Sequence, residues 1–331
     1  MKRLAPFLTA AVLAALACGL PSALMATPRA AEPSAAPPLE ASAPPTADVL
    51  STPAPPTPAP TGAAFDPAKL GATNRDITYC TMEGIALKLD IYYPPANESR
   101  WPAATYVHGG GWSGGDKADG AGALEIPALQ SAGFLVAAVN YRLAPSHPFP
   151  AMIEDVKCAV RYLRAHADEY NLDPDRIGAW GGSAGGHLVN LLGTADESAG
   201  FDVGEYLEYS SRVLAVVDMF GPADLTVQFE GGYESARRVF DGFDAALASP
   251  VTYVSPDDPP FLLLHGDSDK LVPIEQSQEL LAALQAVGVP AELVTVTNAG
   301  HGFKPAGSAP IEPSRQRISQ MVVEFFTQNL R

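Results

Sequence analysis

The sequence predicts an α/β fold with a mostly parallel, eight-stranded sheet that is covered by helices on both faces. From residue 65 onward, apolar stretches of strand length alternate with segments of helical periodicity. These roughly 265 residues suit one doubly wound domain. The first two strands follow each other without an intervening helix. We therefore expect them to form an antiparallel edge of the sheet.

Each element is predicted from its own pattern. Short apolar runs bounded by Gly, Pro, Asn or Asp indicate strands, and apolar residues recurring every three or four positions indicate helices. The expected strands lie at 76–81, 85–93, 103–108, 134–140, 175–181, 213–219, 261–265 and 291–297, and the expected helices at about 119–132, 150–168, 184–194, 233–247, 274–287 and 314–329.

Residues 1–17 have the pattern of a secretory signal peptide. Lys2 and Arg3 precede an apolar run that is too short to span a membrane. Cys18 follows a small-x-small sequence, which indicates a lipoprotein signal and a lipid anchor. Cleavage after Ala26 with free secretion is the alternative. We expect an exported protein without a transmembrane span.

Residues 18–64 are rich in Pro and Ala and cannot bury a core, so we expect a disordered, partly polyproline linker. The folded domain should then occupy residues 65–331. The formal net charge of −16 argues against binding to nucleic acid or to an anionic membrane. Export permits a disulfide between Cys80 and Cys158. Nothing in the sequence brings them together, and we expect two buried thiols.

A serine at a strand-to-helix turn is the strongest chemical signal in the chain. The sequence Gly-Gly-Ser-Ala-Gly at 181–185 separates an apolar stretch from a helix-like run. A G-x-S-x-G turn strains the serine backbone and exposes its hydroxyl at a helix N-terminus. Its glycines avoid clashes with the adjoining strand and helix. We predict that Ser183 is a nucleophile.

A glycine run upstream predicts the groups that stabilise negative charge. His-Gly-Gly-Gly-Trp at 108–112 follows an apolar strand. Acyl transfer builds charge on a carbonyl oxygen, and losing one fixed amide donor to it typically costs ~100- to 1000-fold in rate. The amides of Gly110, Gly111 and Ala184 would form this oxyanion hole. An ordinary glycine turn is the alternative, which the order of the two motifs disfavours.

The base and the acid are expected downstream of the serine. His301 lies in a Gly-rich loop after the last strand, and Asp267 and Asp269 follow the strand at 261–265. The order Ser, Asp, His is that of the α/β-hydrolases. In this arrangement His301 takes the proton of Ser183 while an aspartate fixes the tautomer of the histidine. Both aspartates stand where such sheets place catalytic groups.

Several longer segments carry a family resemblance. They are HGGGW at 108–112, NYRLAP at 140–145, FPAMIEDVKCAVRYLR at 149–164, DPDRIGAWGGSAGGHL at 173–188, HGDSDKLVP at 265–273 and AGHGF at 299–303. The chain resembles the hormone-sensitive-lipase-like branch of the α/β-hydrolases, and most of all the bacterial feruloyl- and acetyl-esterase-like proteins grouped as BD-FAE. The resemblance implies that Asp269 is the acid and that Asp267 caps a loop.

Two departures from the wider family concern the pocket. Gly182 stands where relatives carry an acidic residue, and only about forty residues of the domain precede the glycine run, too few for an N-terminal helical cap. We expect a minimal cap and short acyl groups. The segments 196–210 and 229–248 are alternative lids. Their lining would be Phe201, Tyr206, Phe229 and Tyr233.

The other histidines and Trp112 are the further candidates for site residues. The six histidines show no H-E-x-x-H or other metal spacing, so we expect neither a metal nor a cofactor. His187 is expected to pack within its helix, and His265 to fix a loop by hydrogen bonds. For Trp112 two interpretations stay open, a platform for the substrate and a lid on the core.

These features predict an exported serine carboxylic-ester hydrolase. It would cleave short acyl esters through an acyl-enzyme, with a small molecule or a polysaccharide carrying acetyl or feruloyl groups as substrate. An amidase, formamidase or peptidase on the same fold is the second interpretation. A catalytically inactive binding protein is the third, although all three triad positions are filled.

Overall fold

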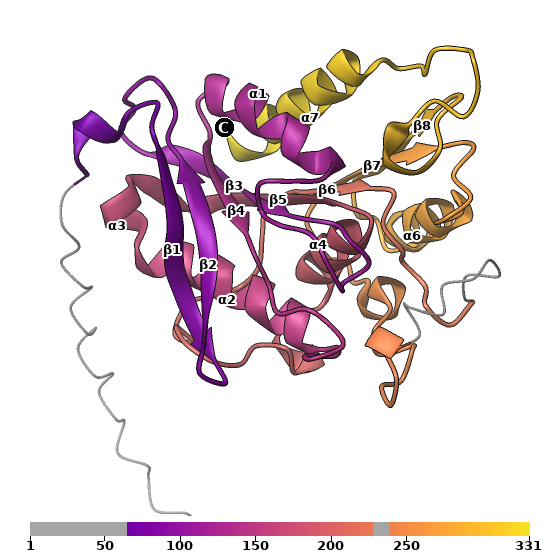
Figure 1. Cartoon of the computed structure of the whole chain (residues 1–331), viewed down its shortest axis with the longest axis horizontal. Coiled ribbons are helices and arrows are strands. Elements are labelled where there is room, and N and C mark those ends of the chain that lie inside the picture. Colours follow the sequence, from indigo (N-terminus) through magenta and orange to yellow (C-terminus); the bar gives the residue numbers. More distant parts are fainter. Residues whose placement is uncertain (1–64, 228–237) are drawn as a thin grey trace, which may run out of the picture. The chain divides into compact units, whose positions relative to one another are not determined.

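One eight-stranded sheet, with the order β1-β2-β4-β3-β5-β6-β7-β8, lies at the centre of the fold (Figure 1). The computed structural model describes residues 65–227 and 238–331. All of them belong to the second of two units, residues 58–331. The strands are β1 (Thr73–Met82), β2 (Ile85–Tyr92), β3 (Trp101–Val107), β4 (Leu135–Val139), β5 (Leu172–Gly182), β6 (Val216–Met219), β7 (Phe261–Gly266) and β8 (Ala291–Val296).

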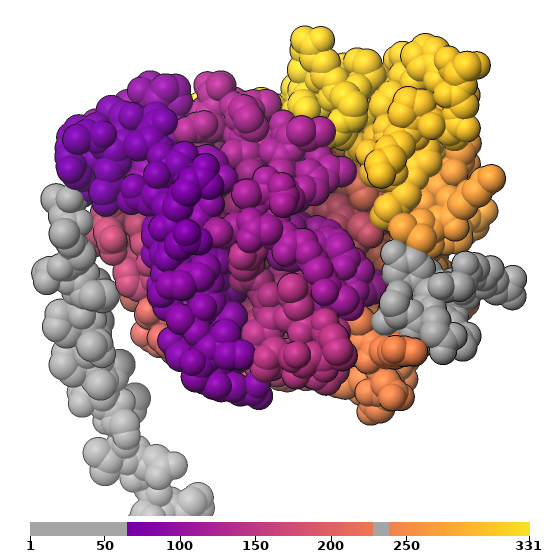
Figure 2. Space-filling view, viewed as in Figure 1, coloured from indigo at the N-terminus to yellow at the C-terminus, as the bar shows by residue number. Residues whose placement is uncertain are grey.

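The predicted antiparallel edge is confirmed. β1 pairs antiparallel with β2, and β2 pairs antiparallel with β4, whereas all the other neighbouring strands are parallel. In Figure 2 the indigo hairpin of β1 and β2 lies on the side of the domain opposite the orange and yellow C-terminal segments, as the strand order requires. The parallel strands bring the carboxyl ends of β3, β5, β7 and β8 to one edge.

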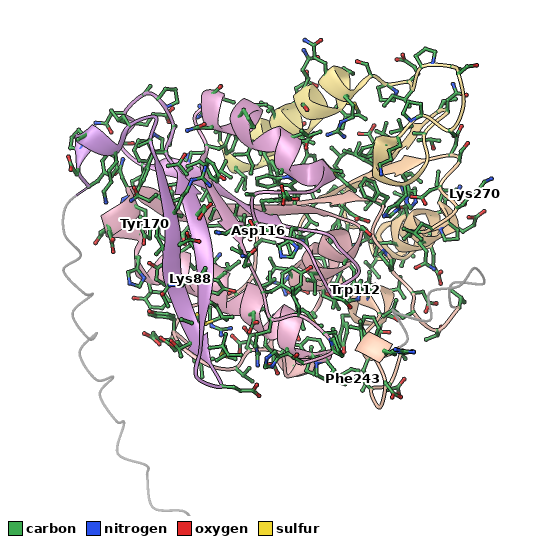
Figure 3. All side chains as sticks on the ribbon, viewed as in Figure 1. Lys88, Trp112, Asp116, Tyr170, Phe243 and Lys270 are labelled. Atoms are coloured by element: carbon green, nitrogen blue, oxygen red, sulfur yellow. A yellow bond between two sulfur atoms is a disulfide. The ribbon has the colours of Figure 1, made fainter. Side chains whose placement is uncertain are left out.

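Helices cover both faces of the sheet, and each face has its own apolar cluster. One cluster joins the sheet to α2, α4 and α6 and contains Trp112 and Tyr170, with Phe243 packed against it (Figure 3). The other joins the sheet to α1 and α7. The helices are α1 (Ile126–Ser131), α2 (Ala151–Ala165), α3 (Ala167–Tyr170), α4 (Ala184–Thr194), α6 (Glu275–Ala286) and α7 (Arg315–Leu330), and the short 3-10 turns are η1 (Pro67–Lys69), η2 (Ala121–Glu125), η3 (Glu197–Ala199), η4 (Pro250–Tyr253) and η5 (His301–Phe303).

Two expected helices differ from the observed elements. The helix expected at 119–132 is divided into η2 and α1. Pro127 lacks an amide donor and therefore fits only in the first turn of a helix, and it lies in the first turn of α1. The helix expected at 233–247 begins on residues outside the described ranges, and residues 240–247 form bends and turns. Before β3, residues 65–100 contain η1, β1 and β2, and the three-residue turn η1 is their only helical element. This agrees with a minimal cap.

The expectation of two free thiols was wrong. Cys80 on β1 and Cys158 on α2 form a disulfide, with their Cα atoms 6.5 Å apart. The cysteines are 78 residues apart in the sequence and meet because α2 packs beneath the edge strand. Local sequence patterns contain no information on this packing.

We predict that replacing both cysteines, in Cys80→Ala/Cys158→Ala, lowers the free energy of unfolding by ~2–4 kcal/mol, because the disulfide restricts the unfolded chain. Urea denaturation of the oxidised protein and the double variant measures the difference. Reduced wild-type protein is the control and should match the variant. Equal stability of the oxidised and reduced wild type would contradict the prediction.

Candidate active site

Ser183 occupies a strained turn between β5 and α4. Its backbone has φ 58° and ψ −122°, a region that costs a non-glycine residue of order 1–3 kcal/mol. Two bonds hold the turn in place. The amide of Ser183 donates to the carbonyl of Met219 at 2.9 Å, and the amide of His187 donates to the carbonyl of Ser183 at 3.0 Å. The serine is therefore fixed by the neighbouring strand and by its own helix.

The glycines around Ser183 allow two backbones to touch. A Cβ on Gly185 would lie 2.1 Å from the carbonyl oxygen of Val107 at the end of β3, and one on Gly181 would lie 2.5 Å from the backbone of Gly185. Side chains at these positions would push β3 and α4 apart. Glycine is thus required in the G-x-S-x-G sequence because this turn is in close contact with the end of β3.

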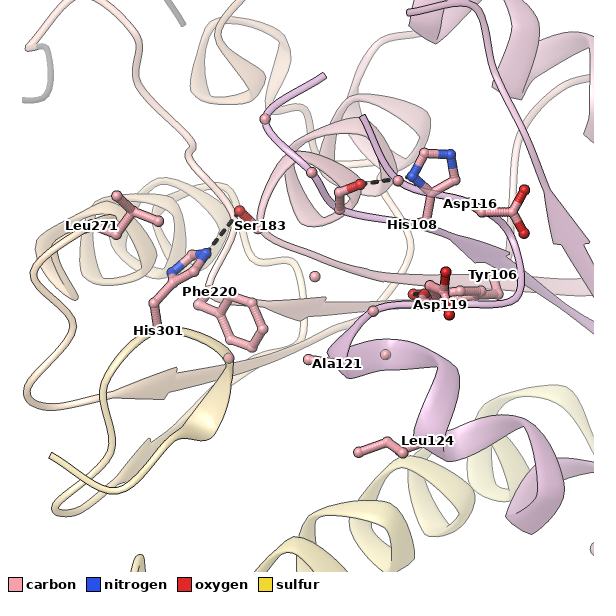
Figure 4. A pocket seen from close by; sticks show the side chains of 18 of the residues that line it. Tyr106, His108, Asp116, Asp119, Ala121, Leu124, Ser183, Phe220, Leu271 and His301 are labelled. Atoms are coloured by element: carbon pink, nitrogen blue, oxygen red, sulfur yellow. Dashed lines mark hydrogen bonds between the residues drawn. The ribbon is translucent and has the colours of Figure 1, made fainter. Parts of the chain in front are cut away.

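A chain of two hydrogen bonds connects Ser183 to a carboxylate. Nε2 of His301 lies 2.9 Å from Oγ of Ser183 (Figure 4), and Nδ1 of His301 lies 2.8 Å from Oδ2 of Asp269. Since a carboxylate can only accept, Nδ1–H donates to Asp269, and Nε2 is left to accept the serine proton. Asp267 does not take part. It is exposed and accepts a bond from Ser268.

Asp269 is held as an anion by its surroundings. Burial raises the pKa of Asp269, but the bond from His301 and the backbone amides of Leu271 and Val272 outweigh this effect, so the pKa lies below its usual value. His265 supports the same loop: one ring nitrogen lies 2.8 Å from the Val272 carbonyl and the other 2.7 Å from the Ser277 hydroxyl. Burial lowers the pKa of His265 and favours its neutral form.

The glycine loop, residues 108–112, lies directly against the nucleophile turn. A Cβ on Gly109 would lie 2.7 Å from the carbonyl oxygen of Gly182. Gly110 and Gly111 have φ of 115° and 59°, and both border the pocket that contains Ser183. Among the described residues, no acceptor is bonded to their amides or to that of Ala184, at the start of α4. Gly110 and Gly111 thus line the same pocket as Ser183, and Ala184 directly follows Ser183 in the chain.

The pocket above Ser183 has a volume of about 660 Å³. Figure 4 shows Ser183 and His301 on one side and Asp116, Asp119 and Leu124 on the other. The second side belongs to residues 113–124, which we call the 113–124 segment. Leu124 is 63% exposed, so this wall stands partly in solvent. Much of the remaining lining is glycine backbone.

The lid expected at 196–210 lies elsewhere. None of its residues borders the pocket. Phe201 packs on Phe149, and Tyr206 packs on Tyr162 of α2. Asp202 of this segment also accepts bonds from Lys157 and Arg161 of α2. The segment is thus fixed against α2, and the expectation that 196–210 forms a lid is wrong. For the alternative lid, 229–248, Phe229 and Tyr233 lie outside the described residues.

Trp112 is part of the core. It is 2% exposed, does not border the pocket, and packs against His187 and Phe240 with ring centroids 5.4 and 5.0 Å away. The platform interpretation is corrected accordingly. His187 is fully buried in α4, as expected of a packed helical histidine.

Phe220, which no sequence motif singled out, lines the pocket beside His301. Its ring lies 4.9 Å from that of His301, edge to face. A Cβ on Gly182 would lie 3.0 Å from the tip of the Phe220 ring. An acidic side chain at 182 would therefore compete with Phe220 for space, which explains the glycine. Phe220 stands two residues after Asp218, and a buried aspartate within an apolar strand was the available signal.

Asp218 fixes the turn that carries Phe220. It accepts bonds from the amide of Gly221 at 2.9 Å and from the side chain of Asn190 at 3.0 Å. Burial raises the pKa of Asp218 to about 6, although both bonds act in the opposite direction. Within residues 65–227 and 238–331, no group of three or more His, Cys, Asp or Glu side chains is placed to hold a metal ion. No helix in these ranges is long and apolar enough to cross a membrane.

A strained serine after a central parallel strand, joined through histidine to a carboxylate beyond a later strand, is the arrangement of an α/β-hydrolase. The comparisons with known proteins agree. The BD-FAE family model matches residues 89–284, and the chain belongs to this family. The resemblance noted in the sequence is thereby confirmed. A second model, described as TAP-like protein, matches residues 243–327.

Curated relatives include esterases of Mycobacterium tuberculosis. The probable carboxylic ester hydrolase LipM is 32% identical over 269 residues, which cover 77% of this chain and 62% of LipM. Esterase LipC is 30% identical over 230 residues, which cover 66% of this chain and 57% of LipC. The aligned part thus spans about three fifths of these relatives.

Solved structures of esterases share the fold over most of their length. A truncated carbohydrate esterase from gut microbiota has a TM-score of 0.67 and 29% identity, covering 81% of this chain and 99% of its own. Esterase 2 of Thermogutta terrifontis with bound butyrate has a TM-score of 0.66 and 27% identity, covering 76% of this chain and 93% of its own.

We predict that Asp269→Asn lowers kcat for p-nitrophenyl acetate by ~10⁴-fold, because an amide at this position favours the wrong tautomer of the histidine. Asp267→Asn is the matched control and should stay within about twofold of wild type, since an exposed carboxylate contributes little. Initial rates of the two folded variants provide the measurement. The reverse order of effects would show that Asp269 is not the acid.

Proposed function

We propose that the protein is a serine carboxylic-ester hydrolase. The observation that carries this proposal is the continuous chain from Oγ of Ser183 through His301 to Asp269, beside free amides of the glycine loop. The names of the relatives and structural neighbours, which include carboxylic ester hydrolases and a carbohydrate esterase, point to the same chemistry.

The proposed reaction has two halves. Oγ of Ser183 bonds to the ester carbonyl carbon while its proton moves to Nε2 of His301, and the amides of Gly110, Gly111 and Ala184 donate hydrogen bonds to the oxyanion. Collapse of this intermediate breaks the bond between the carbonyl carbon and the alcohol oxygen, and His301 gives the proton to the departing alcohol. Water then attacks the acyl carbon and gives one proton to Nε2 of His301. The bond between the acyl carbon and Oγ breaks, His301 returns the proton to Oγ, and the carboxylic acid leaves.

Asp269 supports both halves of the reaction without accepting a proton. Its depressed pKa keeps it ionised while the imidazole becomes positively charged. The attraction between the two ions therefore increases as the reaction proceeds, which stabilises the transition state more than the ground state.

The substrates that we propose are short acyl esters, including acetyl or feruloyl groups on carbohydrate. Much of the pocket lining is glycine backbone, and the large apolar side chains, such as Phe220, Leu271 and Leu124, are few, which favours short acyl groups over a long chain. The partly exposed 113–124 segment leaves room for a bulky alcohol in solvent. Thermogutta terrifontis esterase 2 has been solved with butyrate and with propionate bound, which supports short acyl groups here.

We further propose that the protein is exported. The leader at 1–17 has the charge and length of a secretory signal. A disulfide such as Cys80–Cys158 is typical of proteins that fold in an oxidising compartment. A lipid anchor at Cys18 and a free N-terminus after Ala26 are the two outcomes, and the intact mass of the exported protein distinguishes them.

Ser183→Ala should lower kcat for p-nitrophenyl acetate by roughly 10⁵- to 10⁶-fold, because no other group replaces the nucleophile. Ser198→Ala on η3 is the matched control and should retain wild-type activity. The corresponding anilide, tested in parallel, should react far more slowly than the ester. Undiminished esterase activity of folded Ser183→Ala would refute the proposal, and faster cleavage of the anilide would favour an amidase.

Across p-nitrophenyl esters from two to twelve carbons, kcat/KM should be highest for acetyl to butyryl groups. Each further CH₂ gains at most ~0.8 kcal/mol when fully buried, and we expect carbons beyond the first few to stay in water. The rate series on wild-type protein provides the measurement. A maximum at eight carbons or above would show that apolar side chains cover the site, and it would contradict the prediction of short acyl groups.

A further inference from the structure

We propose that Trp112 and His187 are positioning residues that hold the oxyanion hole against the nucleophile helix. The inference rests on the proposed esterase function and extends it to a buried pair that does not border the pocket. Trp112 directly follows Gly111, and His187 lies one helical turn after Ser183. A bond between their side chains therefore connects the two halves of the site.

The backbone of the glycine loop requires an external support. Gly110, Gly111 and Trp112 have consecutive positive φ angles of 115°, 59° and 56°. Glycine accepts such angles readily, but a bulky residue does so only where surrounding contacts fix it. Without contacts that fix Trp112, the end of this loop would relax toward ordinary backbone angles, and the amide of Gly111 would turn with it.

The indole of Trp112 provides this support. Its Nε1–H donates to Nδ1 of His187 at 3.2 Å, and the two rings meet edge to face. Phe240 packs against the indole from another side. The carbonyl of Trp112 also accepts the amide of Ala144 at 2.9 Å. Both the side chain and the backbone of this residue are thus fixed.

His187 is arranged to serve as the acceptor. Nε2 lies 2.7 Å from the carbonyl of Ala248, so Nε2 carries the hydrogen and Nδ1 presents its lone pair to the indole. Burial lowers the pKa of His187 to about 4, although the Ala248 carbonyl acts against this shift. The ring therefore stays neutral at neutral pH and keeps its acceptor. Its own backbone amide bonds to the carbonyl of Ser183.

Loss of the indole–imidazole bond should act on the transition state. The oxyanion forms only after the serine has attacked. Misplaced amides therefore stabilise the transition state less, whereas the binding of the ester is unchanged. A displacement of about 1 Å at such a site typically costs of order 100-fold. The expected signature is a lower kcat at unchanged KM.

Trp112→Phe removes the N–H donor and keeps an aromatic ring in the core. We expect kcat for p-nitrophenyl acetate to fall roughly 10- to 100-fold at unchanged KM. The matched control is Trp101→Phe. Trp101 is also buried, and its indole donates to the carbonyl of Ala96 at 3.0 Å, in a part of the sheet that does not border the pocket. This variant should lose stability without losing kcat.

A second variant keeps the test valid if Trp112→Phe folds poorly. His187→Phe removes the acceptor instead of the donor and should reproduce the lower kcat. In the double variant the two effects should not add, because both remove the same bond. Wild-type kcat in either folded single variant, or additive effects in the double variant, would overturn the inference.

The labelling of Ser183 by a fluorophosphonate separates this inference from the proposed function. Labelling also develops charge on an oxygen in the oxyanion hole, so its rate should fall in Trp112→Phe and stay unchanged in Trp101→Phe. If the wild type is labelled but does not hydrolyse esters, the esterase proposal fails. The labelling rates would still test whether Trp112 and His187 position the oxyanion hole. Equal labelling rates in wild type and Trp112→Phe would overturn the inference.

Discussion

The contact between two backbones, at the end of β3 and at the turn after β5, is the constraint on which the site depends. Cβ atoms on Gly185 and Gly109 would lie only 2.1 and 2.7 Å from carbonyl oxygens of the opposing segment. Glycine alone permits this approach. Because the segments touch, donors and nucleophile face one pocket without a flexible side chain between them. Fixed donors of this kind need no reorganisation as charge develops, which is the main requirement of acyl transfer.

The topology explains how much the sequence could predict. Ser183, Asp269 and His301 each follow a strand of the parallel part of the sheet, and such strands end at one edge, so motif order was enough to group the serine and the histidine with the aspartates after β7. The choice between the aspartates needed a family resemblance. Contacts between distant elements could not be predicted. The Cys80–Cys158 disulfide depends on how a helix packs on the edge strand, and no local pattern encodes the direction in which an indole turns.

Burial and hydrogen-bond partners give identical side chains different roles. His187 and His265 are buried, and burial lowers their pKa values, so each stays neutral with one ring nitrogen as donor and the other as acceptor. His301 is partly exposed, and its two ring nitrogens face the Asp269 carboxylate and the Ser183 hydroxyl. Neutral histidines can therefore fix the loops around the site, while the one beside Asp269 is left to exchange protons.

The contacts of the segment 196–210 explain why it does not line the pocket. Asp202 accepts bonds from Lys157 and Arg161, both buried on α2, at 2.8 and 2.6 Å. A buried charge that loses its partner costs about 3–5 kcal/mol, so this segment cannot swing over Ser183 as a lid. The disulfide ties α2 to the edge strand and fixes the same region further. Within the described residues, the pocket around Ser183 is lined by the glycine loop, by the 113–124 segment and by residues near His301. If the proposed function holds, this geometry favours an ester whose alcohol stays in solvent while its carbonyl reaches the serine.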